Sequence, residues 1–279
     1  MYSPLEAAPL TLVDLQQPVN KNHPLNRGRV AWWLALPNRA SGPTWYDLMG
    51  QSSLALTGMG SGSNGWRGPK RPGGFASVLA DGSAGYLAGS SNLTGFGNGT
   101  ASYTASCWLY LTSTNGTYTR LLANDQPGEN AWYLGLAPSG GTATAYRVQG
   151  GAGDFITGTN VAAGSVTLLT TTYDGTTLRL YQNGVQTASA ASSRSISIST
   201  ATFQVFKPNG FAVYINGQID DVGLWNRALT AAEVYYLYSV SQRGYDGMLN
   251  RIGVPFYATA AAPTGGKNFG SRWWRRGDF

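Results

Sequence analysis

Two turn dipeptides, Asp174-Gly175 and Asn183-Gly184, flank a short segment at 176–182 with the sequence TTLRLYQ. Dipeptides of this kind favour the two-residue turns that join neighbouring antiparallel strands. The region 165–189 is therefore predicted to be a three-stranded antiparallel meander. This pattern is the strongest local constraint on the fold, because a helical bundle or a parallel sheet does not connect its elements in this way.

The composition of the chain extends this β prediction beyond the meander. Charged residues make up 11% of the 279 residues, against roughly 25% in an average domain, and glycine occurs 38 times. Hydrophobic residues make up 42%, which is enough to bury a core. These values exclude a coiled coil and a charged disordered chain, and they are typical of short strands joined by many turns.

Residues 30–239 are predicted to form strands that end in one helix. Thr230 and Glu233 match a helix capping box, and apolar residues follow at helical spacing. Cys107 falls on the apolar face of its strand and is expected to be a small buried side chain. The Gly-rich stretch 58–74 is expected to be a surface loop. The other predicted strands are 30–36, 103–111, 119–125, 131–137, 144–149, 201–207 and 215–226.

The chain is predicted to have three parts: an extended N-terminal arm (1–29), a β domain (30–239) and an extended C-terminal arm (240–279). Prolines interrupt both arms. The C-terminal arm carries six basic and two acidic residues, which is most of the net charge of +6. It is also rich in aromatic residues, and a purely solvated tail has little use for them.

Five segments of the β domain match one family in their order along the chain. They are VAWWLAL with TWYDLMG, FASVLADGSAGYLAG, YTASCWLYL, TTTYDGTTLRLYQNG and GQIDDVGLWNRALTAAEV. These segments resemble the laminin-G-like, concanavalin A-like jelly-roll family of bacterial and phage surface proteins. The resemblance covers about 30–239 and implies an all-β, two-sheet antiparallel jelly-roll sandwich with one short helix. This fold carries lectins, glycosidases, adhesion modules and structural proteins, so the function has to be argued from particular residues.

Glycoside hydrolysis is disfavoured by the arrangement of the acidic residues. Glucanases of this fold alternate two Glu and one Asp along one strand, and no Glu-x-Asp-x-Glu occurs in this chain. Asp220 and Asp221 are adjacent, and adjacent residues of a strand are expected to point to opposite faces. His23 is the one histidine, so a Ser-His-Asp triad would have to use a residue of the N-terminal arm. The chain is therefore predicted not to be an enzyme.

Two kinds of ligand remain open in the β domain. The resemblance implies that Asp220 of the closing strand could bind Ca²⁺, with Asp47 and Asp81 as neighbouring ligands, although no cofactor is required. The alternative is that these aspartates brace turns through hydrogen bonds. The candidates for stacking on a glycan are aromatic residues in or beside predicted loops, with core packing as the alternative for each. They are Trp45, Trp66, Trp132 and Tyr133.

The end of the C-terminal arm is the predicted contact with a partner protein, because Trp and Arg dominate interface hot spots. The residues concerned are Phe269, Arg272, Trp273, Trp274, Arg275, Arg276 and Phe279. Nucleic acid is not an expected partner, because residues 30–239 carry ten basic and nine acidic groups. A membrane is not expected either, because no apolar stretch approaches the ~18 residues of a spanning helix.

Three features together suggest a function. The fold normally works outside cells, the N-terminus shows no secretory signal, and both arms are too aromatic to be idle. A protein that is made in the host cytoplasm and displayed on the virion surface would combine them. The leading hypothesis is a non-enzymatic phage capsid decoration or fibre-associated protein, which forms homo-oligomers, binds other virion proteins through its arms and binds surface glycans through its jelly roll. The alternative is a free carbohydrate-binding lectin or adhesion module, and a glycoside hydrolase is the third hypothesis.

Overall fold

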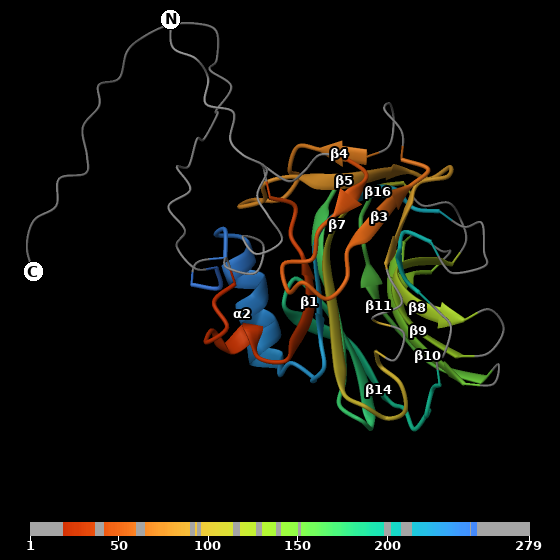
Figure 1. The fold of residues 1–279 in the computed structure, drawn as a ribbon. Coiled ribbons are helices and arrows are strands. Elements are labelled where there is room, and N and C mark those ends of the chain that lie inside the picture. The colour runs from red at the N-terminus through yellow and green to blue at the C-terminus, as the bar shows by residue number, and fades with distance from the viewer. Residues whose placement is uncertain are drawn as a thin grey trace, which may run out of the picture.

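Two antiparallel sheets packed face to face make up most of the computed structural model, and one helix lies against the first of them (Figure 1). The structure describes residues 19–36, 42–59, 65–89, 93, 96–113, 118–126, 130–137, 141–149, 152–197, 202–207, 214–245 and 247–249. The predicted all-β sandwich with one helix is confirmed.

Eight strands form the first sheet, in the order β14-β13-β12-β7-β16-β5-β4, and β1 also pairs with β16. Their bounds are β1 Arg29–Trp33, β4 Gly65–Arg67, β5 Ser77–Asp81, β7 Tyr103–Ser113, β12 Val166–Tyr173, β13 Thr177–Gln182, β14 Val185–Ala191 and β16 Asn216–Trp225. The predicted meander is confirmed as β12, β13 and β14. Asn183 and Gly184 turn between its last two strands with φ of 50° and 82°, a left-handed backbone that these residue types tolerate.

Eight strands also form the second sheet, in the order β11-β10-β9-β8-β15-β6-β3-β2. Their bounds are β2 Thr44–Trp45, β3 Leu54–Thr57, β6 Tyr86–Gly89, β8 Thr119–Gln126, β9 Asn130–Leu136, β10 Thr142–Gln149, β11 Ala152–Asn160 and β15 Phe203–Val205. Strand β11 was not predicted. Its sequence, AGDFITGTN, mixes glycine, threonine and one acidic residue, so it lacks the clean apolar alternation by which a strand is recognised.

The apolar side chains gather in two layers. One layer fills the space between the sheets and includes Cys107, which is fully buried as predicted. Burial raises the pKa of the Cys107 thiol, so this residue behaves as a small apolar side chain. The second layer lies between the first sheet and helix α2 (Ala231–Ser241) and includes Trp108 of β7 and Leu237 of the helix.

Helix α2 begins where the sequence predicts. The Thr230 side chain accepts a hydrogen bond from the Glu233 backbone N–H, and the Glu233 carboxylate accepts one from the Thr230 N–H, which completes the capping box. Val234, Leu237 and Val240 then face the first sheet and are buried there. The helix therefore covers the outer face of the first sheet.

The described ends of the chain lie on this same helix-covered side. Val19 and Leu249 form an isolated antiparallel bridge, and both pack in or against the layer under α2. A short 3-10 helix at Pro24–Asn26 adds Leu25 to that layer. Residues 19–29, 240–245 and 247–249 of the two predicted arms thus contact the sandwich, while the domain boundaries remain predictions. Within the described ranges, no helix has the length and apolarity needed to cross a membrane.

Candidate functional site

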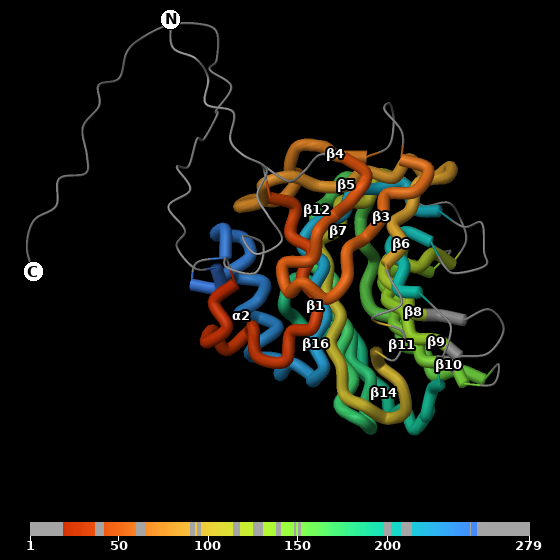
Figure 2. The backbone as a smooth tube through the Cα atoms, viewed as in Figure 1, coloured from red at the N-terminus to blue at the C-terminus, as the bar shows by residue number. Residues whose placement is uncertain are grey.

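An aromatic row crosses the outer face of the second sheet. The strand register pairs Tyr133 of β9 with Tyr146 of β10, and Tyr146 with Phe155 of β11. The next residues along two of these strands, Trp132 and Ile156, belong to the core between the sheets. Successive side chains of a strand alternate between faces, so the three paired rings point outwards. Strands β8 to β11 lie on the far side of the sandwich from α2 (Figure 2), and we call Tyr133, Tyr146 and Phe155 the aromatic row.

The rings of the aromatic row are in contact with one another and differ in exposure. The ring centroids of Tyr133 and Tyr146 are 4.8 Å apart, with 37° between the ring planes. Those of Tyr146 and Phe155 are 6.1 Å apart, with 51° between the planes. Phe155 is 60% exposed and Tyr146 is half-buried, whereas Tyr133 is only 8% exposed. A ligand on this face would therefore contact Tyr146 and Phe155, and Tyr133 would support them from the side.

Gly153 of β11 makes room for the ring of Tyr146. A Cβ atom at position 153 would lie 2.3 Å from both Cζ and the hydroxyl oxygen of Tyr146, which is far inside van der Waals contact. The phenol end of Tyr146 thus occupies the space directly above the Gly153 backbone. The ring leans across β11 because that strand has no side chain there.

Arg120 of β8 extends this surface beyond Tyr133. Its guanidinium lies over the Tyr133 ring, 4.7 Å from the centroid. Burial raises the pKa of Tyr133 to about 12, and the nearby positive charge of Arg120 opposes that rise. The phenol therefore stays protonated at neutral pH and can donate a hydrogen bond. Burial also lowers the pKa of Arg120, with Tyr133 acting in the opposite direction.

The four predicted glycan-stacking residues do not form one surface. Trp45 and Trp132 lie in the core between the sheets, and both are at most 2% exposed, so neither offers a ring face to solvent. Trp66 of β4 packs edge-on against Trp45, and its Nε1–H donates to the Gly42 carbonyl. Tyr133 is the one that joins the aromatic row.

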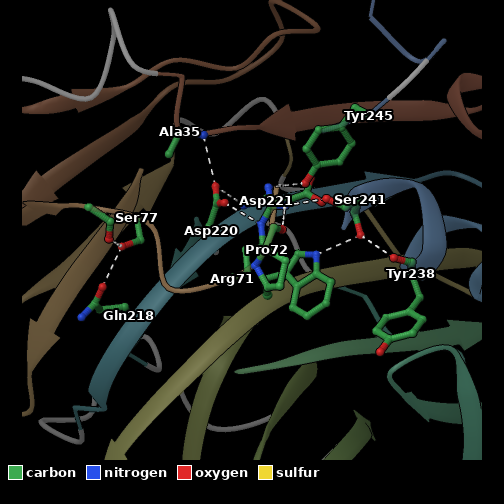
Figure 3. Close-up of polar contacts among 12 residues, drawn as sticks. Ala35, Arg71, Pro72, Ser77, Gln218, Asp220, Asp221, Tyr238, Ser241 and Tyr245 are labelled. Carbon is green, nitrogen blue, oxygen red and sulfur yellow. Dashed lines mark hydrogen bonds and ion pairs between the residues drawn. The ribbon is translucent and has the colours of Figure 1, made fainter. Parts of the chain in front are cut away.

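A group of polar residues lies buried beneath α2 (Figure 3). We call Arg71, Asp220, Ser241 and Tyr245 the Arg71 cluster. The Arg71 Nε–H donates to the Asp220 carboxylate at 2.8 Å, and its other nitrogens donate to the Tyr245 hydroxyl and the Ser241 carbonyl. Burial raises the pKa of Asp220 to about 6, with Arg71 opposing the rise. The Arg71 guanidinium thus pairs with this carboxylate and offsets part of the effect of burial. Arg71 belongs to the predicted surface loop at 58–74, yet its side chain is buried against the first sheet.

Asp220 and Asp221 were expected to point to opposite faces of β16, and this prediction is wrong. The register of β16 against β7 shifts between Asp220 and Gly223, and Asp221 has a left-handed φ of 49°. This bulge turns both carboxylates towards the helix-covered side. Asp221 accepts a hydrogen bond there from the Trp32 indole at 2.6 Å.

The three predicted calcium ligands have separate surroundings. Asp47 is buried and accepts four backbone N–H bonds, from Trp32, Met49, Gln51 and Ser52. Asp81 accepts from the backbone and hydroxyl of Ser83. Asp220 is paired with Arg71. Calcium requires six to eight oxygen ligands around one point. These carboxylates are instead satisfied by N–H and O–H donors, so this set does not fit a shared Ca²⁺ site, and no group of three or more metal-ligating side chains occurs in the described ranges.

The other acidic side chains that the structure describes each form an ion pair. Asp154 of β11 binds Arg194 at 3.3 Å, and Asp174 binds Arg179 at 2.6 Å. Glu233 binds Arg227 at 2.8 Å. None of these pairs belongs to the aromatic row. The seven predicted partner-binding residues, Phe269 to Phe279, lie outside the described residues.

Sequence reasoning missed two members of the aromatic row, Tyr146 and Phe155. Tyr146 was placed on a predicted strand but without a facing partner, and Phe155 lies on the strand that was not predicted. The two-residue period of a strand places Thr144 and Tyr146 on one face of β10 and Ala145 and Arg147 on the other. The register that aligns β9, β10 and β11 is a long-range property, so periodicity within one segment could not reveal it.

A comparison with protein families finds one match. A model of the concanavalin A-like lectin/glucanases superfamily matches residues 81–235, which is more than half of the chain. Among curated protein sequences, none matches.

Solved structures of low identity share the fold. Domain 4 of AbnA, an extracellular GH43 arabinanase from Geobacillus stearothermophilus in complex with arabinotriose, matches at 19% identity with a TM-score of 0.59, over 75% of this chain and 98% of that domain. The binding domain of Paraclostridial Mosquitocidal Protein 1 matches at 15% identity with a TM-score of 0.59, over 77% of this chain and 52% of the other. Trypanosoma rangeli sialidase matches at 14% identity with a TM-score of 0.55, over 77% of this chain and 33% of the enzyme. The fold is thus shared by binding domains and by hydrolases.

Proposed function

Because the chain belongs to the concanavalin A-like lectin/glucanases superfamily, we propose that it is a non-enzymatic domain that binds carbohydrate through the aromatic row. The observation that carries the proposal is that Phe155 is exposed beside the half-buried Tyr146, on the sheet face opposite helix α2. Aromatic side chains offer a flat apolar surface with a polar end, which suits the apolar faces and hydroxyl groups of sugars. Neighbouring apolar side chains left exposed on a sheet face also mark a ligand surface.

The charged residues support binding without bond cleavage. Glycosidases place two carboxyl groups on either side of the scissile bond, at separations of about 5–9.5 Å depending on the stereochemistry. The aromatic row contains no carboxylate, and the nearest acidic residue in sequence, Asp154, is paired with Arg194. Asp220 and Asp221 are buried on the other side of the sandwich. Among the described side chains, no pair of carboxylates flanks the row, which supports a role in which a sugar chain is held and not cut.

The test is calorimetric titration of the full chain with oligosaccharides. Arabinotriose is the first ligand to try, because a domain of the same fold has been solved in complex with it. Tyr146→Ala and Phe155→Ala should each weaken binding about tenfold or more, since covering one aromatic side chain contributes about 1.5–3 kcal/mol. Tyr235→Ala is the control, because Tyr235 is also exposed but lies on α2. Wild-type affinity in both row variants would contradict the proposal.

We also propose that the domain is displayed on a virion, where its arms hold it to neighbouring subunits. The observation in favour is the bridge between Val19 and Leu249, since both predicted arms continue from the helix-covered side, opposite the aromatic row. Such an arrangement would leave the row free to face outwards.

Deletion of 262–279 tests this display role. We expect the shortened chain to lose assembly in analytical ultracentrifugation while its thermal unfolding midpoint stays unchanged, because the deleted residues include the aromatic and basic end of the C-terminal arm. Unchanged assembly together with saturable glycan binding would favour the free lectin instead.

A further inference from the structure

The two accessible rings of the aromatic row are not parallel. The planes of Tyr146 and Phe155 are rotated by 51°, and those of Tyr133 and Tyr146 by 37°. Each ring stands on a different strand, and neighbouring strands of a sheet are themselves rotated by roughly 20–25°. The row is therefore a twisted platform and not a flat one.

A twisted platform selects among sugar chains by their shape. A chain that stacks on both Tyr146 and Phe155 must cross from β10 to β11, so it runs across the strands. The faces of its successive sugars must also turn by about the same angle as the rings beneath them, 51°. Resting on the proposed function, we infer that the ligand is a soluble oligosaccharide whose sugar rings turn from one unit to the next, and not a flat ribbon polysaccharide or its crystalline surface.

The orientation of Tyr146 is built into the protein before any ligand binds. Its phenol end fills the space above Gly153 on one side, and the Tyr133 ring packs 4.8 Å away on the other. Tyr133 is in turn covered by the Arg120 guanidinium. Packing on both sides holds the Tyr146 ring in place, so this ring of the platform is oriented before a ligand binds. Gly153 is accordingly a positioning residue for the platform.

Two hexasaccharides of the same sugar and different linkage test the inference. Successive rings face parallel directions in cellohexaose and turn relative to one another in laminarihexaose. We expect the full chain to bind laminarihexaose about tenfold more tightly than cellohexaose in calorimetric titration, as loss of one stacking contact would cost the flat chain about 1.4 kcal/mol. Tyr146→Ala and Phe155→Ala should each abolish this preference.

Two results would overturn the inference in different ways. Equal or tighter binding of cellohexaose, still weakened by Tyr146→Ala and Phe155→Ala, would overturn the twisted-ligand inference and leave carbohydrate binding intact. No binding of either hexasaccharide or of arabinotriose would overturn the proposed function together with the inference.

Gly153→Ala tests the positioning role separately. The added Cβ would meet Tyr146 at 2.3 Å and force its ring to move, so the ratio of the two hexasaccharide affinities should fall towards one. Gly68→Ala is the matched control, since a Cβ at Gly68 would meet nothing within 4 Å. Thermal unfolding of both variants checks that each is folded. An unchanged affinity ratio in folded Gly153→Ala would overturn the role assigned to Gly153.

Discussion

The outer faces of the two sheets differ in what covers them and in how their polar groups are used. On the first sheet, helix α2 and both described chain ends cover the surface, and beneath them the charges of the Arg71 cluster pair with one another. On the second sheet, no described helix covers the aromatic row, and Phe155 is 60% exposed. The part of the first face under α2 is closed by the chain itself, whereas the second face leaves apolar rings for a ligand.

This difference shows that the strongest polar interactions lie under α2, whereas the side chains that a ligand can contact lie on the second sheet. Buried charge pairs such as Arg71 and Asp220 attract attention in a search for active sites, because their pKa values shift. In this protein their hydrogen bonds are already made within the cluster. The exposed rings carry no charge, yet they are the groups that a ligand can reach.

The largest expected effect comes from breaking the Arg71 cluster. Asp220→Ala leaves Arg71 buried without its carboxylate, so the free energy of unfolding should fall by about 3–5 kcal/mol in urea denaturation. Asp154→Ala is the matched control, because its pair with Arg194 is partly exposed and should contribute about 0–1 kcal/mol. Equal losses in the two variants would show that the cluster is no more important for stability than a surface pair.

A smaller effect is expected at the start of α2. Glu233→Gln removes the charge that pairs with Arg227, while its amide oxygen can still accept from Thr230, so the free energy of unfolding should fall by about 0–1 kcal/mol at pH 7. The hydrogen bonds from Arg227 lower the pKa of Glu233, and burial opposes them. The contribution is thus fully present above the ordinary pKa of 4.5 and disappears as the pH falls through the lowered value in the folded state. A difference between wild type and variant that persists well below pH 4.5 would contradict this account.

The smallest effect on stability is expected at the open face. Phe155→Ala should change the free energy of unfolding by no more than about 0.5 kcal/mol, because most of the ring is already in water. Leu237→Ala, on the buried side of α2, should cost about 2–5 kcal/mol under the same conditions. Similar losses from the two truncations would mean that Phe155 has a structural role and would remove the contrast between the faces.

The local elements could be predicted because their signals lie within a few residues. The turn at Asn183-Gly184 and the capping box of Thr230 and Glu233 each depend on neighbours in the chain, and both occur where expected. Strand β11 was missed since its glycines and threonines hide the alternation on which such predictions depend.

The candidate site could be predicted only in part, because it is assembled from distant segments. Tyr133 was singled out as an aromatic near a loop, but its partners become visible only when β9, β10 and β11 are in register. The partner of Asp220 is 149 residues away at Arg71, in a stretch that composition alone marks as a loop. The left-handed backbone of Asp221 likewise follows from the bulge in β16 and not from the residue type.

The bridge between Val19 and Leu249 has a practical consequence for engineering. Because these two positions are neighbours, the segment from Val19 to Leu249 could be inserted as a cassette into a loop of a host protein, with both junctions at one point. The junctions would lie beside α2, so the guest would present the second sheet away from its host.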